Sequence, residues 1–97
     1  MNDFDEPDRL HSAHVPIRRG SFRKLEWWKP TPARRVLVLA WTCDCQAGFY
    51  ELCQSGGLAF IRRTVQKDGE PEIAETHRWS VRQGWATWFD LLTGEVR

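Results

Sequence analysis

Apolar and polar residues alternate most regularly over residues 36–45, where the sequence reads VLVLAWTCDC. Successive side chains of an extended chain point to opposite faces, so this alternation predicts a β-strand. One set of alternate positions stays apolar throughout, whereas the other set becomes polar at Thr42 and Asp44. We therefore expect the first set to face the core. It consists of Leu37, Leu39, Trp41, Cys43 and Cys45.

Turn residues divide the next segment into three further expected strands. Gly48 closes a short connection whose length suits a hairpin with glycine at a positive φ angle. The Gly-Gly pair at 56–57 marks a second turn, and the Asp-Gly pair at 68–69 is a strong hairpin signal between two strand-like runs. The segment as a whole predicts an antiparallel meander. Its expected strands after the first cover residues 49–53, 58–65 and 73–79.

Residues 80–93 carry the spacing of an amphipathic helix, because their apolar positions recur at offsets of four, three and four residues. Ser80 with Gln83 forms a capping-box pattern at the start, and Gly94 stands where a helix commonly ends. Gly84 costs about 1 kcal/mol in a helix relative to alanine, and a close approach to the sheet is one reason to retain it. The apolar stripe consists of Val81, Trp85, Trp88 and Leu92.

These elements predict an α+β fold, an antiparallel three- or four-stranded β-meander with one C-terminal helix packed on it. The helix is expected to place Trp85 and Trp88 against Leu39 and Trp41. The expected core consists of Leu37, Leu39, Trp41, Cys43, Leu52, Phe60, Ile61, Trp85, Trp88 and Leu92.

The charges divide the 97 residues into three parts, although the net charge is only +1. Residues 1–16 begin with an acidic cluster and show no sustained period, which predicts a disordered tail. Residues 17–35 form a basic arm that interleaves bases with aromatic side chains. Residues 36–97 hold the meander and the helix. A chain of this length makes one domain.

Cysteine usage and hydropathy indicate the compartment. No run approaches the roughly 20 apolar residues that a membrane helix requires, and the acidic N-terminus does not resemble a signal peptide. Three cysteines, an odd number, fit a reducing compartment better than a closed disulfide framework. We therefore expect a cytoplasmic protein that does not enter a membrane.

Cys43, Cys45 and Cys53, with His77 as a fourth ligand, raise the question of a zinc site. Structural zinc sites usually use a C-x2-C pair on a turn. A C-x-C pair inside a strand instead points both sulfurs inward as small apolar groups. We expect core cysteines and no bound metal or other cofactor, with zinc as the alternative.

No catalytic constellation is recognisable in the sequence. The chain has no Gly-rich phosphate loop, no Ser-His-Asp order and no metal-ligand helix. His77 is the single histidine outside the expected tail, and its position in a strand is typical of a sheet histidine. The sequence therefore predicts a protein that is not an enzyme.

The basic arm is the sharpest functional feature. Tryptophan and arginine are common anchors of protein interfaces, so the arm is expected to bind a protein partner, a second copy of the chain included. The alternative is nucleic acid, because bases contact phosphates and aromatic rings stack on nucleobases. A third interpretation is that the arm simply packs on the sheet. The expected partner-binding residues are Arg18, Arg19, Arg23, Lys24, Trp27, Trp28, Lys29, Arg62 and Arg63.

Two resemblances concern residues 35–97. The run FYELCQSGGLAFIRR, followed by ETHRW and a Trp-rich terminal helix, is similar to small proteins of actinomycete bacteria, some on mobile elements, and implies no function. The order of strands, Asp-Gly turn and closing helix resembles the WGR domain of DNA-damage-responsive polymerases, which helps to bind DNA ends. Arg62, Arg63 and Thr64 stand where that family has its Trp-Gly-Arg tripeptide, so none of its site residues carries over.

Overall fold

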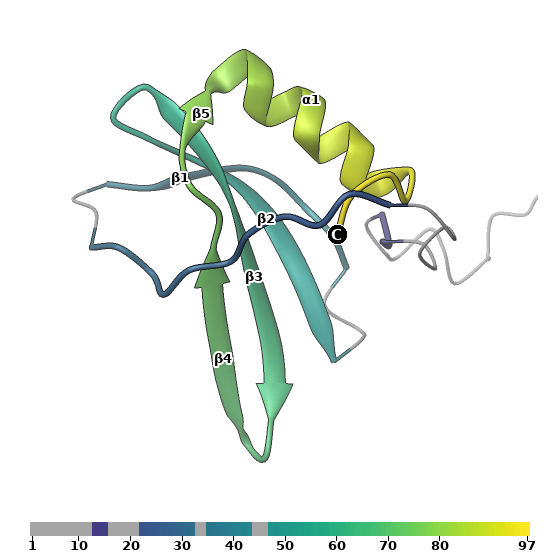
Figure 1. Cartoon of the computed structure of the whole chain (residues 1–97). Helices are drawn as coiled ribbons and strands as arrows, with labels where there is room; N and C mark the ends of the chain where they lie inside the picture. The colour runs from purple at the N-terminus through teal and green to yellow at the C-terminus, as the bar shows by residue number, and fades with distance from the viewer. Residues whose placement is uncertain (1–12, 16–21, 33–34, 44–46) are drawn as a thin grey trace, which may run out of the picture.

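An antiparallel sheet with one C-terminal helix packed on it forms the protein, as Figure 1 shows, and the α+β prediction is confirmed. The structure is a computed structural model that describes residues 13–15, 22–32, 35–43 and 47–97. The order in the sheet is β1-β2-β3-β4, and β5 pairs with the start of β3. The elements are β1 (Leu37–Trp41), β2 (Gly48–Ser55), β3 (Leu58–Lys67), β4 (Glu70–Glu75), β5 (Trp79–Ser80) and α1 (Val81–Leu92).

Both predicted tight hairpins are present. Gly56 and Gly57 have φ angles of 60° and 82° between β2 and β3. Asp68 and Gly69 have φ angles of 48° and 86° between β3 and β4. Positive φ at both central residues matches the turn type whose twist suits paired strands. The expected positive φ at Gly48 is wrong, because this residue begins β2 as part of its ladder with β3.

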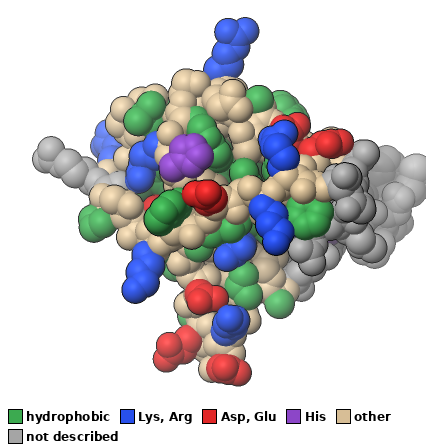
Figure 2. Space-filling view, in the orientation of Figure 1, with side chains coloured by type: hydrophobic (Ala, Val, Ile, Leu, Met, Phe, Trp, Pro, Cys, Tyr) green, Lys and Arg blue, Asp and Glu red, His purple; other side chains and the backbone are tan. Residues whose placement is uncertain are grey.

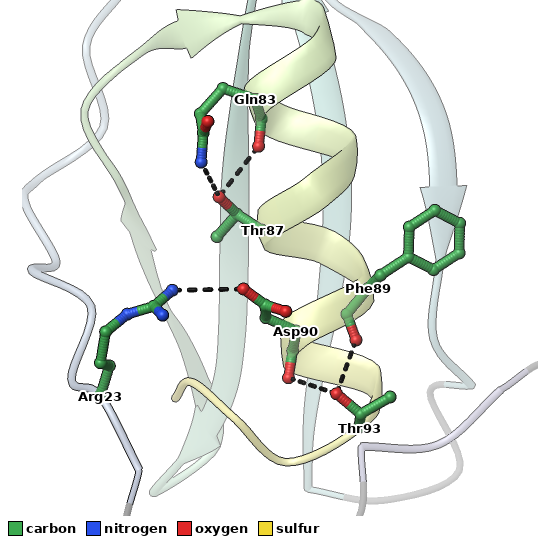
Figure 3. Close-up of polar contacts among 6 residues, drawn as sticks. All are labelled: Arg23, Gln83, Thr87, Phe89, Asp90 and Thr93. Carbon is green, nitrogen blue, oxygen red and sulfur yellow. Dashed lines mark hydrogen bonds and ion pairs between the residues drawn. The ribbon is translucent and has the colours of Figure 1, made fainter.

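Helix α1 begins and ends as its capping residues predict. The Ser80 hydroxyl accepts a hydrogen bond from the Gln83 N–H at 3.1 Å, and Gly94 has a φ angle of 84° beyond the last turn. The reciprocal half of the capping box is absent, because the Gln83 side chain donates to the Thr87 hydroxyl at 3.4 Å instead (Figure 3). No helix in the described part of the chain is long and apolar enough to cross a membrane.

Gly84 marks the point where α1 touches the sheet. A Cβ atom at this position would lie 2.5 Å from the Ala59 Cβ and 3.6 Å from the Leu52 Cδ1. The first distance is shorter than non-bonded carbon atoms tolerate, so only glycine lets the helix backbone lie this close to β2 and β3. The predicted reason for a glycine inside the helix is confirmed.

The core lies between α1 and the sheet and contains Leu52, Ile61 and Trp88 as predicted. Two predicted core residues, Leu37 and Trp41, are instead 55% and 56% exposed. The full buried cluster is Tyr50, Leu52, Ala59, Ile61, Trp88, Leu91 and Val96, with Leu39, Trp85 and Leu92 partly buried against it.

A β-bulge explains the error at β1. Val38 lies opposite Cys53, but Ala40 lies opposite Leu52, so β1 holds one extra residue between them. The extra residue exchanges the faces of all later side chains. Trp41 therefore points away from α1. Leu37 precedes the bulge and lies at the start of the strand, where no described element covers it.

The single strand expected over residues 73–79 is interrupted at Thr76, between β4 and β5. At the interruption, Thr76 hydrogen-bonds to Ile61 of β3 through both its backbone and its side chain. Its N–H donates to the Ile61 carbonyl at 3.0 Å, and its hydroxyl accepts from the Ile61 N–H at 3.0 Å. The same hydroxyl donates to the His77 carbonyl at 2.8 Å. The interruption leaves the buried backbone of Ile61 fully hydrogen-bonded.

Candidate functional site

The described part of the basic arm, residues 22–32, crosses the same sheet face as α1, in front of β2 and β3 (Figure 1). At one end, the Arg23 N–H donates to Glu95 at 2.8 Å, and the Arg97 N–H donates to Arg23 at 3.0 Å. At the other end, Trp28 and Glu75 exchange two backbone hydrogen bonds of 2.7 and 2.8 Å. The arm is thus joined to the C-terminal segment and to the β4 edge.

Residues 13–15, which the sequence assigns to the disordered tail of residues 1–16, also contact the sheet. Ala13 forms a parallel bridge with Thr42, and its carbonyl accepts the Cys43 N–H at 2.8 Å. Val15 packs against the core. The rest of the predicted tail lies outside the described residues.

Trp27 and Trp28 have different environments although they are adjacent. The Trp27 indole is half-buried, lies 5.9 Å from the Tyr50 ring, and donates to the Arg97 carbonyl at 3.2 Å. The Arg63 guanidinium stacks 4.5 Å from its centroid. Trp28 is 58% exposed. Trp27 therefore packs on the α1 face, and Trp28 remains available on the surface.

Those predicted basic residues that the structure describes do not gather on one surface. Arg23 forms an exposed ion pair with Asp90 of α1, with an N–O distance of 3.3 Å (Figure 3). Lys24 and Lys29 are exposed, and Arg18 and Arg19 lie outside the described residues. Figure 2 shows basic side chains spread over the face that carries α1 and the arm, with acidic side chains among them.

Arg62 and Arg63 lie on opposite faces of β3, because successive strand residues alternate. Arg63 contacts Trp27 on the α1 face. Arg62 points to the other face, where its Nε donates to the Glu51 carboxylate at 2.9 Å. This hydrogen bond raises the pKa of the Arg62 guanidinium above its ordinary value. Strand alternation alone already implies that the two arginines do not form one patch.

We call the sheet surface opposite α1 the open face. Antiparallel partners share a face, so the pairing of Glu51 with Arg62, and of Arg62 with Glu75, defines it across three strands. Seven large hydrophobic side chains are exposed in the described part of the chain, and two of them, Leu37 and Phe89, lie elsewhere. The five on the open face are Trp28, Val38, Trp41, Leu58 and Ile73.

A groove of about 450 Å³ runs along the open face between β2, β3 and β4. A second hollow of about 480 Å³ adjoins it at Glu75 and is lined by Trp28, Lys29 and His77 among others. Trp41 on β1 and Trp28 beside β4 stand at the two edges of the face. The groove itself is lined by Pro30, Phe49, Glu51, Arg62, Thr64, Gln66, Pro71, Ile73 and Glu75.

The centre of the open face is polar and internally paired. Arg62 and Glu51 form the ion pair described above, and both side chains are about one-quarter exposed or less. Glu75 is 5% exposed, and its carboxylate accepts the Thr31 N–H at 3.1 Å. One guanidinium and two carboxylates therefore meet here, so this centre carries no surplus of positive charge.

One end of the open face is covered. Phe60 and Cys53 are fully buried there, and the Arg78 guanidinium lies 4.4 Å from the Phe60 centroid. Burial raises the pKa of the Cys53 thiol to about 11. Cys53 is therefore a protonated core thiol at neutral pH, as an apolar cysteine environment requires.

The residues considered for zinc lie in different places. Cys43 is half-buried beside His14 in a small cavity of about 180 Å³, and His77 is exposed with its ring edge-on to Trp79 at 4.9 Å. Cys45 lies outside the described residues. Within residues 13–15, 22–32, 35–43 and 47–97, no group of three or more His, Cys, Asp or Glu side chains is placed to hold a metal ion.

Sequence reasoning missed most of the open face. Val38, Trp41 and Ile73 were not among the expected site residues. Trp28 and Arg62 were, and both lie on it, while Lys29 lines the adjoining hollow. Alternation along β3 and β4 places Ile73 on the same face as Arg62, because their strand partners are Thr64 and Glu75. No comparable signal identifies Trp41, because the bulge determines its side.

Comparison with known proteins does not assign this chain to a family, and the two resemblances remain expectations. No protein-family model matches the chain, and neither a curated protein nor a solved structure does.

Proposed function

We propose that this protein is a small, non-enzymatic, cytoplasmic binding module whose partner protein docks on the open face. One observation carries the proposal: five of the seven exposed large hydrophobic side chains in the described residues lie on this face. Exposed apolar side chains that are rimmed by or set among polar groups on one surface often mark interaction sites. On the opposite face, α1 and the arm cover the apolar residues other than Leu37.

The residue types on the open face suit a protein interface. Trp28 and Trp41 are 58% and 56% exposed, and tryptophan contributes more binding energy than most residues when a partner buries it. Arg62 and Glu51 lie between the two tryptophans and offer hydrogen-bonding groups to a partner. Their ion pair holds both side chains in position. Because strands hold these side chains in place, less conformational entropy is lost when a partner binds.

The charges favour a protein over nucleic acid at this site. Nonspecific nucleic-acid binding needs several basic groups directed at phosphates. Arg62 is paired with Glu51, Arg23 with Asp90, and Arg63 stacks on Trp27. Nucleic acid bound through the basic arm is the alternative function, and the experiment below separates it from protein binding.

The test compares three versions of the full chain as bait in an extract of the native host. These are the unchanged chain, a double variant with Trp28→Ala and Ile73→Ser, and the control Phe89→Ala. Phe89 is as exposed as Trp28, at 58%, but lies on α1, where Figure 3 shows its ring directed away from Arg23. A partner that docks on the open face is recovered with the unchanged chain and the control, and it is lost with the double variant.

The recovered protein must then bind the purified chain directly, with the same ranking of the three versions. Equal recovery by all three versions, or no protein recovered by any, contradicts the proposal. Recovery that a nuclease abolishes, or that Lys24→Ala with Lys29→Ala abolishes, supports the nucleic-acid alternative instead.

A further inference from the structure

Trp28 and Glu75 stand side by side at the hollow of about 480 Å³ that adjoins the groove. Their two backbone hydrogen bonds, of 2.7 and 2.8 Å, make them an antiparallel pair between the arm and β4. The side chains of such a pair lie on the same face, with their Cβ atoms about 5 Å apart. Both side chains line the hollow, so an exposed indole and a carboxylate border the same space.

The Glu75 carboxylate is buried, yet most of its hydrogen-bonding capacity is unused. The residue is 5% exposed, and its Oε1 accepts the Thr31 N–H at 3.1 Å. Among the residues that the structure describes, this is the one hydrogen bond of its side chain. A carboxylate can accept about four hydrogen bonds, and buried polar groups are usually satisfied. A ligand in the hollow that presents hydrogen-bond donors would complete this set.

Positive charge in the same hollow indicates the rest of the ligand. Lys29 and Arg78 both line it, and neither forms an ion pair within the described part of the chain. Both would repel a cationic side chain, which is otherwise a common partner of a carboxylate beside a tryptophan. Both would attract a phosphate group. The hollow therefore suits a ligand that combines a flat, donor-bearing ring with negative charge.

We propose that this hollow binds a guanine nucleotide, with the base stacked on the Trp28 indole and its Watson–Crick edge on the Glu75 carboxylate. Guanine presents two adjacent donors at that edge, N1–H and the N2 amino group, whereas adenine and cytosine present a donor beside an acceptor. Trp28 is 58% exposed, and a stacked base covers its ring. The volume of about 480 Å³ falls within the roughly 300 to 1,000 Å³ of small-ligand sites.

This proposal goes beyond the proposed function, because it assigns the hollow to a small ligand and leaves the groove to the partner protein. Lys29 and Arg78 hold the phosphate, so the four side chains account for both ends of the nucleotide.

The experiment is calorimetric titration of the purified full chain with guanosine 5′-monophosphate. Trp28→Ala should weaken binding by roughly 10-fold or more, because a stacking ring is lost. The matched control is Trp41→Ala, which removes a tryptophan of similar exposure at the other edge of the open face and should bind like the unchanged chain. Glu75→Gln keeps an acceptor for the Thr31 N–H but removes the carboxylate, so it should also weaken binding by roughly 10-fold or more.

Base discrimination by the unchanged chain tests the same contact without any substitution. Inosine 5′-monophosphate, which lacks the N2 amino group, should bind more weakly than the guanosine nucleotide. Adenosine 5′-monophosphate should bind most weakly, because its N1 is an acceptor that faces the carboxylate. Equal binding of the three nucleotides, or no binding of the guanosine nucleotide, overturns the proposal. So does a Glu75→Gln variant that binds as tightly as the unchanged chain.

A short RNA with one guanosine among uridines distinguishes the two sources of the base. Tighter binding of this RNA assigns the site to guanine in single-stranded RNA, and tighter binding of the mononucleotide assigns it to the free nucleotide. Ile73 lines the groove but not the hollow, so Ile73→Ser should bind the nucleotide like the unchanged chain. The same variant tests the partner protein, so the two proposals can fail separately.

Discussion

The two faces of the sheet are made from the same strands, yet one is a packed core and the other is open. On the α1 face, Leu52, Ile61 and Trp88 are at most 2% exposed. On the open face, Trp28 and Trp41 are more than half exposed, around a polar centre that pairs its own charges. Apolar residues therefore lie on both faces, but the open face is covered only at the end that holds Phe60 and Cys53. The covered face supports stability, and the open face is the surface that we propose for binding.

Substitution of Trp88 tests the covered face and has the largest expected effect. Trp88 is 2% exposed between α1 and the sheet. Trp88→Ala should lower the free energy of unfolding by about 3 to 5 kcal/mol, because it removes a large buried ring and leaves a cavity. Urea denaturation measures the change. The neighbouring variant Phe89→Ala should stay within about 0.5 kcal/mol of the unchanged chain, and similar losses for both would contradict the assignment of the core.

Thr76 tests the junction between the two faces, where β4 ends. Thr76→Val keeps the shape of the side chain but removes the hydroxyl that accepts from the Ile61 N–H. We expect a loss of about 1 to 3 kcal/mol, because a buried N–H is left without an acceptor. The control is Thr93→Val, whose hydroxyl is exposed at the end of α1 and should matter far less (Figure 3). A neutral Thr76→Val would show that the ladder closes without this hydroxyl.

The pH dependence of stability tests whether Cys53 is buried at the covered end of the open face. Burial raises its pKa from 9.0 to about 11, so the folded state binds the thiol proton more tightly than the unfolded state. This contribution to stability is complete below pH 9 and is lost as the pH rises toward 11. Unfolding measured at a series of pH values should show a loss over this range that Cys53→Ala lacks. Identical pH profiles for both proteins would mean that the thiol is not buried.

Truncation on the rest of the open face should have the smallest effect on stability. Trp28→Ser removes a side chain that is 58% exposed, so the free energy of unfolding should change by no more than about 0.5 kcal/mol. Thermal denaturation of the isolated protein measures this change. A loss as large as that of Trp88→Ala would show that the open face belongs to the core.

Local signals in the sequence predicted the elements well. The Asp68-Gly69 turn and the Ser80 cap act over a few residues, so their chemistry specifies their geometry. The close contact behind Gly84 could also be anticipated, because a glycine inside a helix needs a packing reason.

Long-range features were not predictable in the same way. The bulge between Val38 and Ala40 leaves no mark in the sequence, because both sets of alternate positions are apolar over residues 36–41, so the predicted side of Trp41 is wrong. The course of the arm depends on isolated contacts with the far end of the chain, such as the bridge between Trp28 and Glu75. Such contacts have no periodicity, so the sequence could not place the candidate site.

Hydroxyl-radical footprinting of the tryptophans tests the central contrast most directly. Trp28 and Trp41 should be oxidised rapidly, Trp27 more slowly and Trp88 hardly at all. Oxidation of Trp88 at the rate of Trp41, or protection of Trp28 and Trp41 in the monomer, would contradict the assignment of one covered face and one open face.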